Sequence, residues 1–191
     1  MKDIVLASAS PRRSQLLKQI GLDFRVLTSD VDETIDKTIS AQEAVKYLSV
    51  KKASDVSGRI AKGPLIIGAD TVVVKDAILG KPRDEEEAFS MLKSLQNQWH
   101  EVITGITVID TLTGKVISDF EKTRVKMRSL SDSMIHSYIN TKEPFDKAGA
   151  YGIQGMGAIL VERLEGCYFN VVGLPLTKLT MILELFEVRV M

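Results

Sequence analysis

The stretch Ala7-Ser8-Ala9-Ser10-Pro11-Arg12-Arg13 decides how this chain begins to fold. It follows the apolar run Ile4–Leu6, typical of a short buried strand, and leads into residues 13–20, whose apolar spacing is helical. Ser10 stands at the N-cap position and Pro11 at the first helical position, where proline is favoured. Such a turn presents backbone N–H groups, hydroxyls and guanidiniums at one helix N-terminus. That arrangement suits a phosphate, although an ordinary solvated helix start is the alternative.

Composition sets broad limits on the protein. The 191-residue chain has 25 basic and 25 acidic residues and 45% apolar residues, so it suits one sizeable domain or two small lobes. The balanced charge argues against a nucleic-acid-binding protein, whose affinity depends on neutralising phosphates. The first residues lack signal-peptide features, no apolar run is as long as a membrane span, and Cys167 is the lone cysteine. We therefore expect a cytoplasmic protein without an internal disulfide.

Helical and strand patterns alternate along the chain. Ser40 (in a capping box with Glu43), Asp84 and Ser131 stand at N-cap positions. The β-branched segments within 99–127, joined at Thr113-Gly114, predict an antiparallel hairpin. Strands mixed with helices around this hairpin indicate an α/β fold with a mixed, twisted sheet. Besides the first strand and helix, we predict helices over residues 41–56, 85–96, 132–140 and 175–186, and strands over 24–27, 65–67, 72–74 and 158–161.

Asp70 is the sharpest candidate for a catalytic carboxylate. It ends an apolar strand and follows Gly68-Ala69, which lets another group approach the backbone closely. A carboxylate at the end of a buried strand is desolvated unless it has a partner or a role. A carboxylate that only caps the next turn is the alternative. Thr71 offers a hydroxyl beside it.

Three further charged residues suit phosphate or metal binding. Glu33 stands in an acidic connection that is most simply a solvated loop. Together with Asp70 it could hold a divalent cation, because magnesium takes one or two protein carboxylates besides waters and phosphate oxygens. Gly80-Lys81-Pro82 places Lys81 in a stiff turn, well suited to neutralising phosphate charge. Lys52 has a weaker local case, because a lysine pair on a helix is usually solvated.

The glycine-rich tract 146–155 is a second candidate for contact with a nucleotide. Its glycines permit positive φ and close approach of a ligand. Gln154 carries an amide donor and acceptor that match the edge of a base. The tract is neither a P-loop nor a dinucleotide-binding fingerprint. His100 and His136 are isolated in the sequence, and we expect them to be packing or surface residues.

Taken in order, these segments resemble the Maf (septum formation) family of nucleoside triphosphate pyrophosphatases. The resemblance spans nearly the whole chain in the family's order and spacing, with no departure at a motif position. The matching motifs are Ser8-Ala9-Ser10-Pro11-Arg12-Arg13, Glu33, Lys52, Gly68-Ala69-Asp70-Thr71, Gly80-Lys81-Pro82, residues 147–155 and residues 170–175.

The resemblance implies a single domain over residues 1–191. Its expected fold is an elongated α/β structure of two lobes around a central cleft, similar to that of inosine triphosphate pyrophosphatases. The expected oligomeric state is a homodimer. The implied reaction is hydrolysis of dTTP or UTP between the α- and β-phosphates, giving a nucleoside monophosphate and pyrophosphate. The implied cofactor is a divalent cation, Mg²⁺ or Mn²⁺. The implied cellular role is cleansing of nucleotide pools or arrest of division, with no nucleic-acid or membrane partner.

Site roles follow from the same resemblance. Asp70 would be the proton acceptor, and Glu33 and Asp70 would bind the metal; whether Asp70 is base, ligand or both stays open. Lys52 and Lys81 would act in catalysis by offsetting charge on the departing pyrophosphate. The remaining residues would bind the substrate: Ser8, Ser10, Arg12, Arg13, Thr71 and Gln154. Of these, Arg12, Thr71 and Gln154 would also select the base.

Other functions compete with this one. A non-catalytic nucleotide-binding regulator of septum formation would need the phosphate cradle but not both Glu33 and Asp70. A phosphotransferase or sugar-nucleotide enzyme would depend on an acceptor other than water. A single-stranded nucleic-acid binder is disfavoured by the zero net charge and by the lack of aromatic platforms on the strands.

Overall fold

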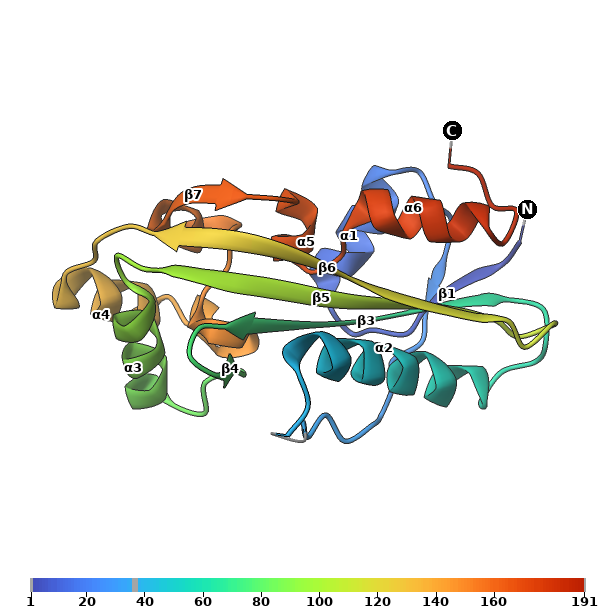
Figure 1. Ribbon diagram of the computed structural model, residues 1–191, viewed down its shortest axis with the longest axis horizontal. Helices are drawn as coiled ribbons and strands as arrows, with labels where there is room; N and C mark the ends of the chain where they lie inside the picture. Colours follow the sequence, from blue (N-terminus) through green and yellow to red (C-terminus); the bar gives the residue numbers. More distant parts are fainter. Residues whose placement is uncertain (1, 36–37, 191) are drawn as a thin grey trace. The chain divides into compact units, whose positions relative to one another are not determined.

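A mixed sheet runs through the computed structural model, which describes residues 2–35 and 38–190. Its strands in that part of the chain are β1 Ile4–Leu6, β2 Arg25–Val26, β3 Leu65–Val74, β4 Ile78–Leu79, β5 Trp99–Asp110, β6 Val116–Met127 and β7 Val161–Glu165. Their order is β2-β1-β3-β5-β6-β7, with β4 paired to β3 (Figure 1). β1 pairs in parallel with β2 and β3, whereas β3–β4 and β6–β7 are antiparallel. The predicted α/β class with a mixed sheet is confirmed.

In the described residues, each α-helix except α5 begins within one residue of its predicted start. They are α1 Pro11–Gln19, α2 Ala41–Ser57, α3 Glu85–Leu95, α4 Asp132–Asn140, α5 Tyr168–Val172 and α6 Leu176–Glu184. The side chains of Ser40, Asp84 and Ser131 each accept a bond from a first-turn N–H, and Ser40 completes the predicted capping box. Ser10 is the N-cap of α1, but among the described residues its side chain accepts no capping bond.

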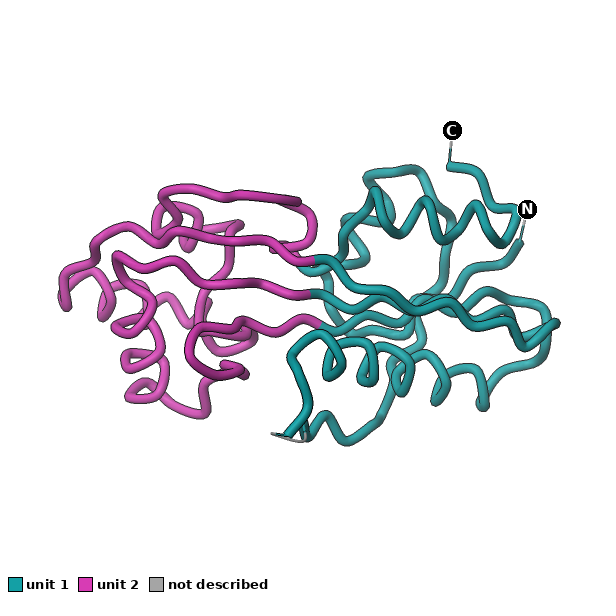
Figure 2. Tube along the Cα trace, in the orientation of Figure 1, with its two compact units in different colours: residues 1–70, 104–121, 173–191 teal, residues 71–103, 122–172 magenta. Residues whose placement is uncertain are grey.

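The chain divides into two compact units, each with its own apolar core (Figure 2). Unit 1 comprises residues 1–70, 104–121 and 173–191, and unit 2 comprises residues 71–103 and 122–172. In unit 1, α2 lies on one side of the strands and α1 and α6 lie on the other (Figure 1). A cluster that includes Val5, Ala53 and Ile66 fills the α2 side. In unit 2, α3 and α4 contribute to a core with β5 and β6.

Two glycines let α2 lie unusually close to the sheet. A Cβ on Gly68 of β3 would stand 2.3 Å from the Ser49 carbonyl oxygen, and one on Gly105 of β5 would stand 2.2 Å from the Val45 carbonyl oxygen. Real Cβ atoms do not approach a carbonyl so closely. The group that approaches the backbone at Gly68 is therefore the protein's own helix α2.

Three local predictions are wrong. Asp70 does not end a strand but lies within β3, which continues to Val74. The strand predicted over residues 158–161 is wrong for its first three residues, which belong to the 3₁₀ helix Gly155–Leu160. Only Val161 lies in a strand, as the first residue of β7. The tight glycine backbone of that segment overrides the β propensity of its apolar residues. The five-residue helix α5 was not predicted.

We expect Gly68→Ala and Gly105→Ala each to lower the free energy of unfolding by about 1–3 kcal/mol or more, because α2 must move away from the sheet. Urea denaturation measures the change. Gly58→Ala is the matched control, since Gly58 has helical φ and a Cβ there would meet Ser54 O at an ordinary 3.6 Å. A Gly68→Ala protein as stable as the Gly58→Ala protein would contradict this account of the packing.

Candidate functional site

The buried face of α2 carries a lysine. Lys52 follows Val45, Leu48 and Ser49 in the helical stripe that faces the sheet, and only 6% of it is exposed. Its Nζ donates to Asp70 Oδ1 at 2.7 Å and lies 2.8 Å from Glu33 Oε1. The expectation of a solvated lysine is therefore wrong for Lys52. Its ammonium instead brings together two carboxylates 37 positions apart in the sequence.

Side chains of α2 and the residues after it hold the connection that carries Glu33. Lys51 Nζ donates to the Asp32 carbonyl at 2.7 Å, and the Asp55 carboxylate accepts from Asp30 N–H at 3.0 Å. Arg59 donates to the Thr28 carbonyl. The acidic connection is thus fastened along α2. Glu33 reaches the site from it with a side chain that stays 49% exposed.

Asp70 is a buried carboxylate with a shifted proton affinity. It is 6% exposed in the interior of β3. Burial raises the pKa of Asp70, and the nearby ammonium of Lys52 and guanidinium of Arg13 oppose that rise without cancelling it. Its pKa therefore lies above the ordinary value. A carboxylate of this kind accepts a proton more readily than an exposed one.

The turn before α1 is fixed by its own side chains. Ser8 Oγ accepts from Ser10 N–H at 3.2 Å and from Arg13 Nη1 at 3.1 Å. Arg13 Nε donates to the Gly173 carbonyl at 2.8 Å. Burial lowers the pKa of Arg13, while the negative charges of Asp70 and Glu33 oppose this shift. Arg13 is thus a buried cation that both braces the turn and acts electrostatically on Asp70.

The role of Gly173 was missed in the sequence. It has a φ of 120°, and its carbonyl is the acceptor for Arg13. Only its membership in the motif of residues 170–175 signalled it. The other predicted residues of this turn, Ser10 and Arg12, are half-buried at the start of α1.

The structure gathers five of the predicted site residues in unit 1. A hydroxyl, two cations and two carboxylates converge there: Ser8, Arg13, Lys52, Glu33 and Asp70. Because the N-terminus of α1 adds a positive partial charge, this cluster can hold an anion next to a carboxylate of raised pKa.

Unit 2 holds the lysine turn next to the glycine tract. Gly149 N–H donates to the Gly80 carbonyl at 3.0 Å, and Gly149, with φ 69°, packs so tightly on Val73 that a Cβ would meet it at 2.9 Å. Lys81 is exposed directly after this contact, and Gln154 is half-buried. Thr71 is the next residue after Asp70 along β3 and is also half-buried.

The donor set of unit 1 fits a divalent cation of the magnesium type. Among the described residues, no group of three or more His, Cys, Asp or Glu side chains could hold a metal ion. Glu33 and Asp70 nevertheless converge on one point, now held by the Lys52 ammonium. Two carboxylates, with waters and phosphate oxygens, are what Mg²⁺ commonly takes. The residues present therefore suit a cation that arrives with a phosphate ligand.

Both histidines have packing contacts, as predicted. His100 Nε2 shares a hydrogen bond of 2.6 Å with the Tyr151 hydroxyl in the core of unit 2, and burial lowers the pKa of His100 to about 4. His136 stacks on Phe89 at 4.8 Å between ring centroids. Within residues 2–35 and 38–190, the helices fall short of the length and apolar character needed to cross a membrane.

Known proteins resemble this chain over nearly its full length. A family model described as "Maf-like protein" matches residues 3–186. A "dTTP/UTP pyrophosphatase" of Acetivibrio thermocellus is 56% identical over 100% of this chain and 98% of its own. Another, of Alkaliphilus oremlandii, is 53% identical over 96% of each chain. The fold is similar to a solved HAM1 protein from Coxiella burnetii, with a TM-score of 0.52, 13% identity, and coverage of 84% of this chain and 81% of that one.

We expect Lys52→Met to lower the free energy of unfolding by about 3–5 kcal/mol near neutral pH, because it leaves a buried carboxylate without its partner. The folded-state pKa of Asp70 lies above the unfolded value, so protonation favours the folded variant. The loss should therefore shrink as the pH falls from 8 to 5. Urea denaturation across this range measures it.

Lys93→Met is the control, because Lys93 pairs with Asp132 at the exposed surface. It should cost less than about 1 kcal/mol. A Lys52→Met loss that is absent, or that grows as the pH falls, would show that Asp70 does not depend on the ammonium.

Proposed function

The chain belongs to the Maf-like protein family, and from this premise we propose that it is a dTTP/UTP pyrophosphatase. It hydrolyses the triphosphate between the α- and β-phosphates and releases a nucleoside monophosphate and pyrophosphate. The observation that carries the proposal is the buried Asp70–Lys52 pair beside the Ser8–Arg13 turn, with Glu33 on the same ammonium. Relatives at 53–56% identity carry the corresponding name.

In the proposed reaction, the α1 turn binds phosphate. Ser8 Oγ accepts from Ser10 N–H and from Arg13 Nη1, so its hydroxyl proton can be donated to a phosphate oxygen. Arg12, Arg13 and the hydroxyl of Ser10 lie on the same helix start, where backbone N–H groups favour an anion. Lys52 and Lys81 would offset the charge that develops on the departing pyrophosphate.

Asp70 would take the proton of the attacking water. Its raised pKa makes the carboxylate a stronger base, while the Lys52 ammonium favours the ionised form of the buried group. As the water oxygen bonds to the α-phosphorus, the bond to the bridging oxygen breaks. The bonding pair leaves with pyrophosphate.

Glu33 and Asp70 would hold the divalent cation, Mg²⁺ or Mn²⁺. When bound, the cation would neutralise negative charge on the phosphates. The half-exposed carboxylate of Glu33 can turn between Lys52 and the cation without being desolvated.

Arg12, Thr71 and Gln154 would select the pyrimidine. An amide can pair with a base edge through both a donor and an acceptor. Action as a homodimer and a cytoplasmic location stay predictions of the sequence.

Asp70→Asn should lower kcat for dTTP and UTP by about 10²–10⁴-fold, because the amide cannot accept the proton. Pyrophosphate release from purified protein with Mg²⁺ measures it, and circular dichroism should show the fold retained. Asp23→Asn, an exposed aspartate, should retain full activity. An active Asp70→Asn protein would remove Asp70 from its role. Failure of the unaltered protein to release pyrophosphate from any triphosphate would favour the nucleotide-binding regulator.

Removal of divalent cations with EDTA should abolish pyrophosphate release, and added Mg²⁺ or Mn²⁺ should restore it. Glu33→Gln should need a higher cation concentration for half-maximal rate, because one of two charged ligands is lost. The matched control is Glu86→Gln, an exposed carboxylate on α3. Equal cation dependence in the Glu33→Gln and Glu86→Gln proteins would exclude Glu33 as a ligand.

A further inference from the structure

The segment that carries Gln154 is pinned on both sides by one pair of side chains in unit 2. Tyr138 of α4 accepts a bond from Gly152 N–H at 3.3 Å through its hydroxyl. The Glu143 carboxylate accepts from Met156 N–H at 3.0 Å through Oε2 and from Gly157 N–H at 3.1 Å through Oε1. The Tyr138 hydroxyl donates to Glu143 Oε1 at 2.9 Å, which joins the two anchors. Gln154 lies midway between them in the chain.

The backbone closes so tightly around this pair that only glycine fits. Gly155 has a φ of 64°, and a Cβ there would stand 2.7 Å from Glu143 Oε2. A Cβ on Gly157 would stand 2.2 Å from the Gly152 carbonyl oxygen and 2.6 Å from the Tyr138 hydroxyl. The conformation of the segment is therefore shaped to the carboxylate and the phenol.

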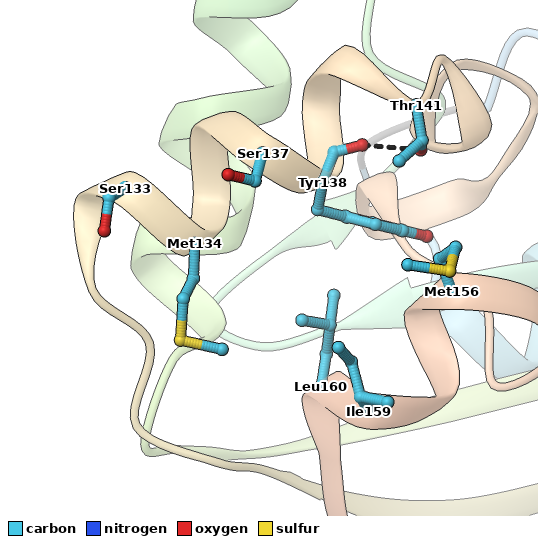
Figure 3. A pocket seen from close by; sticks show the side chains of 8 residues that line it. All are labelled: Ser133, Met134, Ser137, Tyr138, Thr141, Met156, Ile159 and Leu160. Atoms are coloured by element: carbon cyan, nitrogen blue, oxygen red, sulfur yellow. Dashed lines mark hydrogen bonds between the residues drawn. The ribbon is translucent and has the colours of Figure 1, made fainter.

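Two of the apolar side chains that follow Gln154 are largely exposed. Met156 and Ile159 are 57% and 58% exposed. A cavity of about 200 Å³ separates their side chains from α4, with Met134 and Leu160 also in its wall (Figure 3). In this view Tyr138 extends from α4 toward Met156 (Figure 3). Hydrogen bonds to Tyr138 and Glu143 thus anchor the backbone on both sides of Gln154.

The electrostatics favour an ionised acceptor. Burial would raise the pKa of Glu143, but bonds from Gly157 N–H, the Tyr138 hydroxyl and Met156 N–H, with the charge of Lys147, lower it overall. Burial and the bond to Glu143 raise the pKa of Tyr138, so its hydroxyl stays a donor. A carboxylate that accepts three bonds has no chemical need of a further ligand. Glu143 therefore has a structural role, which is to hold the backbone at Met156 and Gly157.

We propose that Glu143, together with Tyr138, is a positioning residue that holds Gln154 at the edge of the base and so sets the selectivity for pyrimidine triphosphates. The inference rests on the proposed function. It deepens that function by assigning base selection to residues that need not touch the nucleotide. Small displacements of a positioning group can cost large factors in selectivity.

Glu143→Gln tests the proposal with little change of shape. The new NH₂ group must face a backbone N–H, donor against donor, so the segment cannot keep its conformation. With dTTP, UTP and dATP as substrates and pyrophosphate release as readout, KM for dTTP and UTP should rise about 10-fold or more. Their kcat should change less than 3-fold, and the preference for dTTP over dATP should fall about 10-fold.

Glu162→Gln, an exposed carboxylate on β7, is the matched control and should leave all constants unchanged. If Glu143→Gln does not fold, Tyr138→Phe, which removes one anchor, should shift KM and selectivity in the same direction. Unchanged KM and selectivity in a folded variant would overturn the positioning role, even if its unfolding midpoint falls. Absence of pyrophosphate release by the unaltered protein would overturn the proposed function itself, and this role with it.

Discussion

A lysine and an aspartate buried against each other impose the strictest demand on this structure. Removing an ammonium and a carboxylate from water costs several kcal/mol for each ion, and only close pairing offsets this cost. Lys52 must therefore reach Asp70 at hydrogen-bond distance, which it does at 2.7 Å. That contact requires α2 to lie nearly on the sheet, and Gly68 and Gly105 allow it to do so.

The same pair organises its surroundings. The lysine has a second carboxylate, Glu33, on a connection that α2 itself fastens through Lys51 and Asp55. Arg13 braces the turn before α1 and adds positive charge near Asp70. In the proposed function, these contacts give a basic carboxylate next to residues that would bind phosphate.

Local sequence predicts the frame well because caps and periodicity act over a few residues. Ser40, Asp84 and Ser131 cap helices where expected, and the hairpin turns near Gly114. Lys52 could not be placed from its neighbours, since a lysine pair on a helix is solvated unless a distant acid recruits it. Its local case was weak, and the family resemblance strengthened it.

Three further errors have physical reasons. We predicted that Asp70 ends a strand because a carboxylate interrupts the apolar residues there. Lys52 of α2 pairs with this carboxylate, so β3 continues through Asp70 to Val74. Glu143 was not singled out because its partners are backbone N–H groups of a later segment, which leave no mark in the residues around it. The apolar residues 158–160 seemed strand-like, although the glycines before them impose a 3₁₀ helix.

A pH titration of the Asp70 carboxyl by carbon-detected NMR, assigned with the Asp70→Asn protein, tests the central claim most directly. We expect the buried Asp70 carboxyl to titrate above the ordinary aspartate value of about 3.9. Replacement of Lys52 should raise the pKa of Asp70 further, because the ammonium lowers it. A carboxyl that titrates at or below the ordinary value, and is indifferent to Lys52, would contradict it.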